Sequence, residues 1–159
     1  MLKRIVYTVI FMFFAGSIAG ASMVSFYVVE TGLSDEAERR THSDQWENAF
    51  LDVFFEAGHI VSNAPILRLE IKPANDILQS VAFDIFDARM GGIEFILIAI
   101  LDYVPDKMSA DEISFYIYNV NTKELLFEKH IQGKIYRTSR EELDDLKAIA
   151  RGLVPYIGE

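Results

Sequence analysis

Residues 95–101 read Phe-Ile-Leu-Ile-Ala-Ile-Leu, and this stretch decides the fold. Every position is apolar, so the segment lacks the alternation of a strand that has one face in water. A strand of this kind is covered on both faces, as in the middle of a layered α/β sheet. The run is also too short to span a membrane, because a membrane-spanning helix needs about 20 residues. It therefore predicts a central strand with helices on both sides of the sheet.

The sequence before this run predicts two strand-helix units. Apolar residues recur at three- and four-residue spacing where helices are expected, and β-branched or alternating residues mark the strands. In chain order, the predicted elements are a strand at 24–29, a helix from Ser43 or Asp44 to Gly58, a strand at 66–71, and a helix from Asn75 or Asp76 to Gly91. The residues between the first helix and the second strand, 58–65, are expected to form a connection.

The sequence after the run predicts a hairpin and a closing helix. Strands at 113–120 and 124–132 flank the short turn Asn-Thr-Lys at 121–123. Ser139 and Glu142 have the spacing of a capping box, which predicts the start of a helix. The predicted order is strand, helix, strand, helix, strand, strand, strand, helix. This is an α/β fold with three helices and a mixed sheet of about five strands, because strand-helix-strand units pair in parallel and a hairpin adds antiparallel strands.

The first 21 residues have the three parts of a secretory signal. Lys3 and Arg4 precede an uncharged apolar stretch at 5–18, and Ala-Gly-Ala at 19–21 is a small-residue cleavage site. Cleavage between Ala21 and Ser22 would leave a single α/β domain at 22–159. The alternative is an uncleaved signal helix that anchors the chain through residues 5–29, because no charged residue occurs between Arg4 and Glu30.

Composition excludes several classes of function. The chain has no cysteine, which excludes disulfides, thiolate metal sites, a cysteine nucleophile and a lipid-modified cysteine. Its net charge is −9, and loss of the two basic leader residues takes it to −11. Because phosphate binding relies on clustered Lys and Arg, this balance argues against nucleic acid. It also argues against charge-driven binding to anionic lipid.

No catalytic motif is present. The chain lacks a phosphate-binding glycine loop and a Gly-x-Ser-x-Gly nucleophile turn. Three histidines, His42, His59 and His130, raise the question of a metal site with carboxylates. However, His59 precedes the second strand while Asp102 follows the third, so the two side chains are expected at opposite ends of a parallel sheet. The sequence therefore predicts no catalytic residue, no metal and no cofactor.

Six residues are candidates for binding. Asp102 and Tyr103 follow the buried run, and ligands bind α/β sheets at the carboxyl ends of central strands. His59 and Asn63 lie in the mixed polar and apolar connection at 58–65. The last two, Tyr116 and Tyr118, share one face of a hairpin strand. For each pair the alternative is a structural role, which is a local hydrogen bond for Asp102 and core packing for the tyrosines.

The run Ala-Phe-Leu-Asp-Val at 49–53 leads into Ala-Gly-His-Ile-Val at 57–61, a helix that ends in glycine before an apolar strand. With the order of elements over residues 24–157, this resembles the periplasmic α/β domains of the TolB amino-terminal and penicillin-binding-protein activator type. The resemblance implies a non-enzymatic envelope domain that docks other proteins. The chain departs from the lipoprotein activators in having no lipid-attachment cysteine, which puts tethering to the outer membrane in doubt.

The export signal and the lack of a catalytic constellation together predict a periplasmic or secreted accessory domain. It is expected to act without catalysis, by protein or ligand binding, with another envelope protein as its partner. Membrane contact is expected only through an uncleaved leader. Two alternatives stay open: a small periplasmic hydrolase or metal-dependent enzyme that uses Asp102 with His59, and an inner-membrane-anchored subunit whose domain lies outside the cytoplasm.

Overall fold

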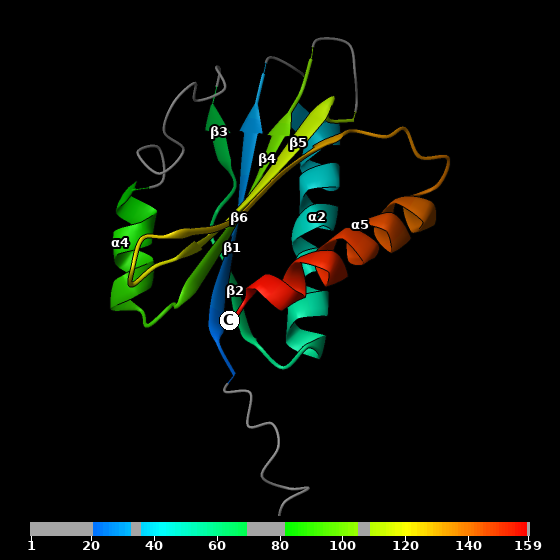
Figure 1. Ribbon diagram of the computed structural model, residues 1–159. Helices are drawn as coiled ribbons and strands as arrows, with labels where there is room; N and C mark the ends of the chain where they lie inside the picture. Colours follow the sequence, from blue (N-terminus) through cyan, green and yellow to red (C-terminus); the bar gives the residue numbers. More distant parts are fainter. Residues whose placement is uncertain (1–20, 33–35, 70–81, 105–108, 159) are drawn as a thin grey trace, which may run out of the picture.

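A computed structural model describes residues 21–32, 36–69, 82–104 and 109–158 (Figure 1). The described residues form an α/β fold with a mixed sheet and three α-helices, as the sequence predicts. In chain order the elements are β1 (Met23–Thr31), α2 (Glu36–Glu56), β2 (Ile60–Asn63), β3 (Leu67–Leu69), α4 (Ala82–Met90), β4 (Phe95–Asp102), β5 (Glu112–Asn119), β6 (Leu125–Gln132), α5 (Ser139–Leu153) and the short 3-10 helix η1 (Val154–Tyr156).

The apolar run at 95–101 is the middle strand of the sheet. The strand order is β2-β1-β4-β5-β6, and β3 also pairs with β1. Strand β1 runs parallel to β2, β3 and β4, whereas β4–β5 and β5–β6 are antiparallel pairs. All seven residues of the run are buried, because helices lie on both faces of the sheet and strands flank it on both sides.

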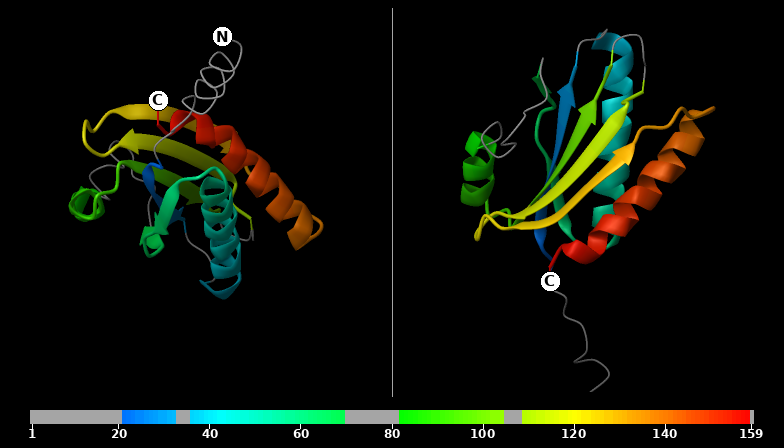
Figure 2. Two further views of the ribbon diagram at one scale, coloured as in Figure 1. Left: turned by 90° about the horizontal axis from the view of Figure 1, so that it is seen from below. Right: turned by 45° about the horizontal axis from the view of Figure 1, so that its top comes forward.

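The two faces of the sheet carry separate hydrophobic clusters. Helices α2 and α5 cover one face, and α4 lies on the other (Figures 1 and 2). Alternate residues of β4 enter the two clusters: Leu97, Ala99 and Leu101 pack with α2 and α5, while Ile96 and Ile98 pack on the α4 side. The period of two along a strand explains this division.

The structure corrects two predicted helix starts, and a third lies outside the described residues. Helix α2 begins at Glu36 and not at Ser43 or Asp44, because Glu-Ala-Glu-Arg-Arg at 36–40 favours a helix without contributing an apolar stripe. The N-cap of α5 is Thr138, whose hydroxyl accepts a hydrogen bond from the Glu141 N–H at 3.2 Å, so the cap is one residue earlier than the Ser139 prediction. The predicted helix start at Asn75 or Asp76 lies outside the described residues.

The single strand predicted at 66–71 begins one residue later, and the connection before it contains a further strand. Residues 60–63 of the expected connection form β2, beside the start of β1, and 67–69 form β3, beside its end. Pro65 lies between them, and proline interrupts a ladder because it has no N–H to donate. Ile60 is 54% exposed, since it belongs to this edge of the sheet and not to the core.

Strand β1 occupies residues that the anchor alternative would place in a bilayer. Residues 24–31 pair with β4 on one side; on the other side residues 23–26 pair with β2 and residues 29–31 with β3. The backbone oxygen of Ser22 accepts a hydrogen bond from the N–H of Ile60 at 3.0 Å. The rest of the predicted leader, residues 1–20, lies outside the described residues. Among the residues that the structure describes, no helix combines the length and apolar character needed to cross a membrane.

Candidate functional site

Asp102 and Tyr103 lie at the carboxyl end of the central strand, where their side chains have structural contacts. The Thr31 hydroxyl donates a hydrogen bond to Oδ1 of Asp102 across the β1–β4 pair, with the two oxygens 2.7 Å apart. The Tyr103 N–H bonds the oxygen of Thr31 at 2.9 Å, and the Tyr103 ring is buried in the cluster beneath α2. A Cβ at Gly32 would lie 1.9 Å from the Tyr103 oxygen, so the chain packs tightly here.

Tyr116 and Tyr118 lie on the α4 side of the sheet, inside or against the second hydrophobic cluster. Tyr116 is 8% exposed, and its ring makes an edge contact with His130 at 6.0 Å between centroids. Tyr118 is half-buried against the same cluster. His130 also bonds Ser114 at 2.7 Å, from Nδ1 to Oγ, and Glu128 at 3.1 Å, from Nε2 to Oε1. The polar network beside Tyr116 therefore holds β5 and β6 together.

His59 directly precedes β2, and Asn63 is the last residue of that strand. The His59 ring packs 5.9 Å from the ring of Phe54, and burial lowers the pKa of this histidine. The side chain of Asn63 donates a hydrogen bond to Oε2 of Glu47 on α2 at 3.2 Å. Burial raises the pKa of Glu47, although the bond from Asn63 acts in the opposite direction. Both contacts join β2 to α2, so they fix the edge of the sheet.

The predicted site residues do not converge on one place. Ile60, next to His59, pairs with Met23 at the start of β1, whereas Asp102 pairs with Thr31 at its end. Eight steps along a strand separate these levels by about 26 Å at roughly 3.3 Å per residue. Proton transfer needs heavy atoms about 3 Å apart. In addition, within the described ranges no group of three or more His, Cys, Asp or Glu side chains is arranged to hold a metal ion.

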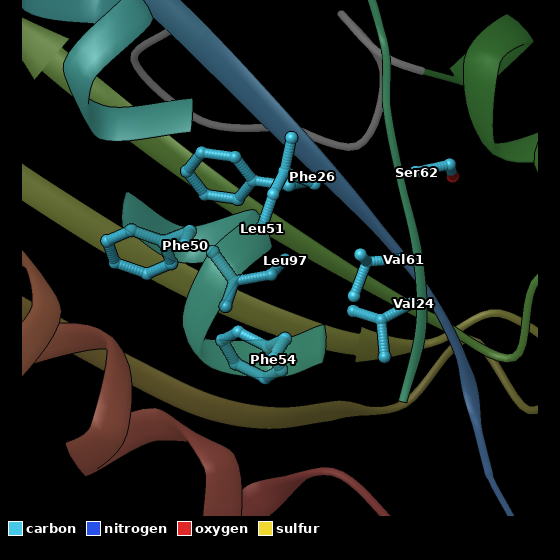
Figure 3. Close-up of a pocket in the computed structure, with 8 residues that line it drawn as sticks. All are labelled: Val24, Phe26, Phe50, Leu51, Phe54, Val61, Ser62 and Leu97. Carbon is cyan, nitrogen blue, oxygen red and sulfur yellow. The ribbon is translucent and has the colours of Figure 1, made fainter. Parts of the chain in front are cut away.

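The pocket between α2 and the sheet is too small for a ligand. Its volume is about 10 Å³, which is at the lower limit for one water molecule. Figure 3 shows the rings of Phe26, Phe50 and Phe54 gathered there with aliphatic side chains from β1, β2 and β4. The Phe26 and Phe50 rings stack with centroids 4.7 Å apart. This space is a small packing gap in the core.

The larger cavity is a groove between β6 and α5, which we call the β6–α5 groove. Its volume is about 380 Å³, within the range of ligand-binding clefts. Figure 2 shows α5 running back beside β6 after the segment that links them. Strands β5 and β6 line one wall, and α5 with η1 line the other; the lining residues are Phe115, Phe127, Lys129, Ile131, Ala148, Ile149, Gly152, Leu153 and Tyr156.

Two contacts frame the β6–α5 groove. The rings of Phe127 and Tyr156 lie 4.2 Å apart and join the two walls. In the segment between β6 and α5, Lys134 and Tyr136 bond Asp145 of α5, with Nζ and the hydroxyl 2.9 and 2.6 Å from Oδ2. The Tyr136 hydroxyl, followed by Lys134, lowers the pKa of Asp145, so this carboxylate stays ionised and holds α5.

Small residues on α5 leave space on the helix side of the groove. Ala148 and Gly152 are four apart on α5, so they lie on the same face of the helix. A Cβ built at Gly152 would have no atom within 4 Å. Leu146, Ala150 and Leu153 of α5 are buried in the core cluster that α2 shares, and Leu153 also lines the groove. The groove therefore remains open although α5 is firmly packed.

Of the residues that the structure describes, Lys129 is the one charged side chain that lines the β6–α5 groove. It lies on β6 between Phe127 and Ile131, which share its face of the strand. Within the described part of the chain no ion pair involves Lys129, whereas Lys134 and Lys147 pair with aspartates. An exposed, unpaired ammonium group is thus set among apolar side chains.

The sequence prediction did not identify this groove. One signal was present, because Lys129 interrupts an apolar alternation that includes Phe127 and Ile131. A second was Gly152, a glycine inside an amphipathic helix, where it weakens the helix unless another role requires it. Neither signal says that the strand and the helix lie side by side, since that depends on how α5 returns across the fold.

Comparisons with known proteins show a similar fold at low sequence identity. No family model and no curated protein matches this chain. A variant PelC dodecamer from Paraburkholderia phytofirmans is similar at a TM-score of 0.51 and 15% identity, over 87% of this chain and 90% of that one. TolB from Acinetobacter baumannii has a TM-score of 0.43 and 13% identity, over 86% of this chain and 27% of that one. The LpoB C-terminal domain from Salmonella enterica has a TM-score of 0.42 and 15% identity, over 79% of this chain and 90% of that one.

At these identities the likeness concerns the fold alone. TolB and the LpoB domain are nevertheless among the structures found, at low identity. This confirms the fold-level resemblance that the order of elements predicted from the sequence.

Proposed function

We propose that this chain is an exported domain that acts in the cell envelope by binding another protein, without catalysis. The observation that carries the proposal is the β6–α5 groove, which combines half-exposed apolar side chains with one unpaired cation. Small-molecule sites add a few precisely placed polar groups to a mostly apolar lining and bury most of the ligand. Among the described residues that line this groove, Lys129 is the only charged one and it is exposed, which suits contact with a protein surface.

Export is inferred from the leader at residues 1–21. We infer that cleavage falls between Ala21 and Ser22, because the fold begins directly afterwards: Ser22 is buried and already bonded to Ile60. Amino-terminal sequencing of the exported protein tests this inference. A chain that begins at Ser22 supports it, whereas a chain that begins at Met1 means that the leader is retained as an anchor.

A second copy of the chain is the alternative partner. PelC, which shares this fold, is described as a dodecamer. Self-association would also use the β6–α5 groove if the edge strand of one copy met a complementary surface on the next. The experiment below separates the two partners, because a crosslinked adduct with a second copy has twice the mass of the chain.

The test is site-specific photocrosslinking in intact cells that produce the full chain. A photoreactive phenylalanine analogue replaces Tyr156, which lines the groove and is 38% exposed. The control replaces Phe86 of α4, which is 64% exposed on the other side of the sheet. A discrete adduct with another protein from position 156, and none from position 86, supports the proposal. An adduct from position 86 alone, or from neither position, refutes it.

A further inference from the structure

We infer that the β6–α5 groove binds its partner by strand addition, with an extended segment of the partner pairing along the free edge of β6. The segment that fits has apolar side chains on either side of an acidic one, at alternate positions, and the acidic side chain meets Lys129. This inference rests on the proposed function and names the mode of recognition and the chemistry of the partner.

The first support is the free edge itself. Strand β6 is the last strand of the sheet in the described part of the chain, and α5 lies beside it without pairing. Unpaired N–H and C=O groups of an edge strand are a template for another strand. The opposite edge is made of shorter strands, because β2 and β3 together replace one strand there.

The second support is the direction of the β6 backbone groups. The Gly133 N–H bonds the oxygen of Asp111, the residue directly opposite, at 2.9 Å. In an antiparallel ladder directly bonded pairs alternate with unbonded ones. The backbones of Phe127, Lys129 and Ile131 therefore face β5, and those of Glu128, His130 and Gln132 face outward. Three successive outward positions are enough for a short added strand.

The third support is the pattern of side chains on the groove side. Phe127, Lys129 and Ile131 alternate along β6, with the cation in the middle. Side chains directly opposite on paired strands interact, and apolar and opposite-charge pairs are favourable. The complement of this row is apolar, acidic, apolar. Because Glu128 and His130 occupy the other face of β6, the alternate residues of the added segment are polar.

The fourth support is space on the α5 side of the sheet. The groove, with a volume of about 380 Å³, lies over the face of β5 and β6 that carries Phe115, Phe127 and Lys129. An added strand runs about 4.8 Å from β6 in the plane of the sheet, so its side chains on this face point toward the groove. Gly152 and Ala148 project little into it, and the space over Gly152 is open. The helix therefore acts as a side wall that receives the apolar side chains of the added segment.

A peptide-binding experiment tests the inference on the full purified chain. The probe is the peptide Ser-Thr-Val-Thr-Glu-Thr-Val-Thr-Ser with blocked ends, and a second peptide carries Lys in place of the central Glu. We expect the Glu peptide to bind about fivefold more tightly, because like charges directly opposite are unfavourable. Lys129→Glu is expected to reverse this preference. Calorimetry or fluorescence anisotropy measures both affinities.

Two variants at one position separate backbone pairing from side-chain contact. Glu128→Pro removes an outward N–H from the edge without breaking the β5–β6 ladder, and edge strands tolerate proline at such a position. We expect it to reduce peptide affinity at least about tenfold, while Glu128→Ala leaves it within about twofold, because only the proline removes a backbone donor. Circular dichroism and the Tm show whether each variant is folded, and the Ala variant keeps the comparison valid.

Several outcomes overturn the inference. These are no saturable binding of either peptide, a charge preference that Lys129→Glu does not reverse, and equal binding by the Pro and Ala variants. Self-association of the chain that Glu128→Pro abolishes would assign the edge to a second copy instead. If the peptides fail while position 156 still crosslinks to another protein, strand addition is wrong and the proposed function stands.

Discussion

Thr31 and Asp102 are joined across the parallel pair at the centre of the sheet, with the threonine hydroxyl 2.7 Å from the carboxylate. They are register partners at the carboxyl ends of β1 and β4, the level at which α/β sheets commonly bind ligands. In this protein the Asp102 carboxylate accepts a hydrogen bond that joins two strands of the sheet. The surface that we propose for binding lies instead at the edge of the sheet.

Removing the Thr31 hydroxyl tests this assignment. We expect Thr31→Val to lower the free energy of unfolding by about 1–2 kcal/mol, since the part-buried carboxylate loses a donor. Thr31→Ser keeps the hydroxyl and should cost less. Urea unfolding measures both changes, and a larger loss in Thr31→Ser than in Thr31→Val would show that the methyl group matters more than the hydrogen bond.

The second prediction about stability concerns the buried carboxylate of Glu30. Glu30 is 3% exposed and accepts hydrogen bonds from Ser43 and from Nε of Arg68, the latter at 2.8 Å. Arg68→Met leaves this carboxylate without its cation and should lower the free energy of unfolding by about 1–3 kcal/mol. Arg137→Met is the control. Its side chain has no ion pair within the described residues, so a change below about 0.5 kcal/mol is expected in urea unfolding.

The contact of Tyr136 and Lys134 with Asp145 predicts a dependence on acid. The hydrogen bonds from these two side chains hold the pKa of Asp145 below its ordinary value of 3.8. A depressed carboxylate pKa adds stability that is complete above 3.8 and is lost as the pH falls through the folded-state pKa. Tyr136→Phe should therefore cost about 1 kcal/mol at neutral pH, and the deficit should shrink in acid.

Urea unfolding of both proteins from neutral pH down to about pH 2 measures that deficit. A deficit that stays constant across the range would contradict a role for the ionised carboxylate of Asp145. It would indicate that the Tyr136 hydroxyl contributes through contacts that do not depend on this charge.

For His59 we predict a pH dependence in a higher pH range than for Asp145, because burial lowers its pKa and no hydrogen bond contributes to the shift. Burial lowers its pKa below the ordinary value of 6.5, so the unfolded chain takes up a proton first. Stability is therefore unaffected above 6.5 and declines as the pH falls from there toward the folded-state pKa. We expect His59→Phe to remove this part of the decline. NMR titration of the His59 ring gives its pKa directly, and an ordinary or raised value would rule out the effect.

We predict that a methyl group added at Gly152 raises the stability of the protein. A Cβ there meets nothing within 4 Å, and glycine within a helix is less favourable than alanine, so Gly152→Ala should raise the free energy of unfolding by about 0.5–1 kcal/mol. Gly133→Ala is the contrasting variant. Its Cβ would lie 1.7 Å from the oxygen of Ala110, and we expect a loss of about 1–3 kcal/mol from overpacking. Thermal unfolding compares the two, and a destabilised Gly152→Ala would show that the groove wall is closed.

The apolar run at 95–101 determined by itself that β4 lies in the middle of an α/β sheet, because an unbroken apolar strand is stable only when both of its faces are covered. The hairpin and the closing helix likewise followed from local turn and periodicity signals. Boundaries moved where a charged segment favoured a helix, as at Glu36, or where Pro65 separated two short strands.

Only the tertiary structure decided where the open groove lies. Lys129 on β6 and Gly152 on α5 are far apart in the sequence, and they line one groove because α5 packs on the same face of the sheet as α2 and returns beside the edge strand. Tyr116 and Asp102, which the sequence offered as binding residues, are held by burial and by a hydrogen bond. Local patterns record which side chains a segment buries, but the path of the closing helix depends on contacts between distant segments, and that path leaves the β6–α5 groove open.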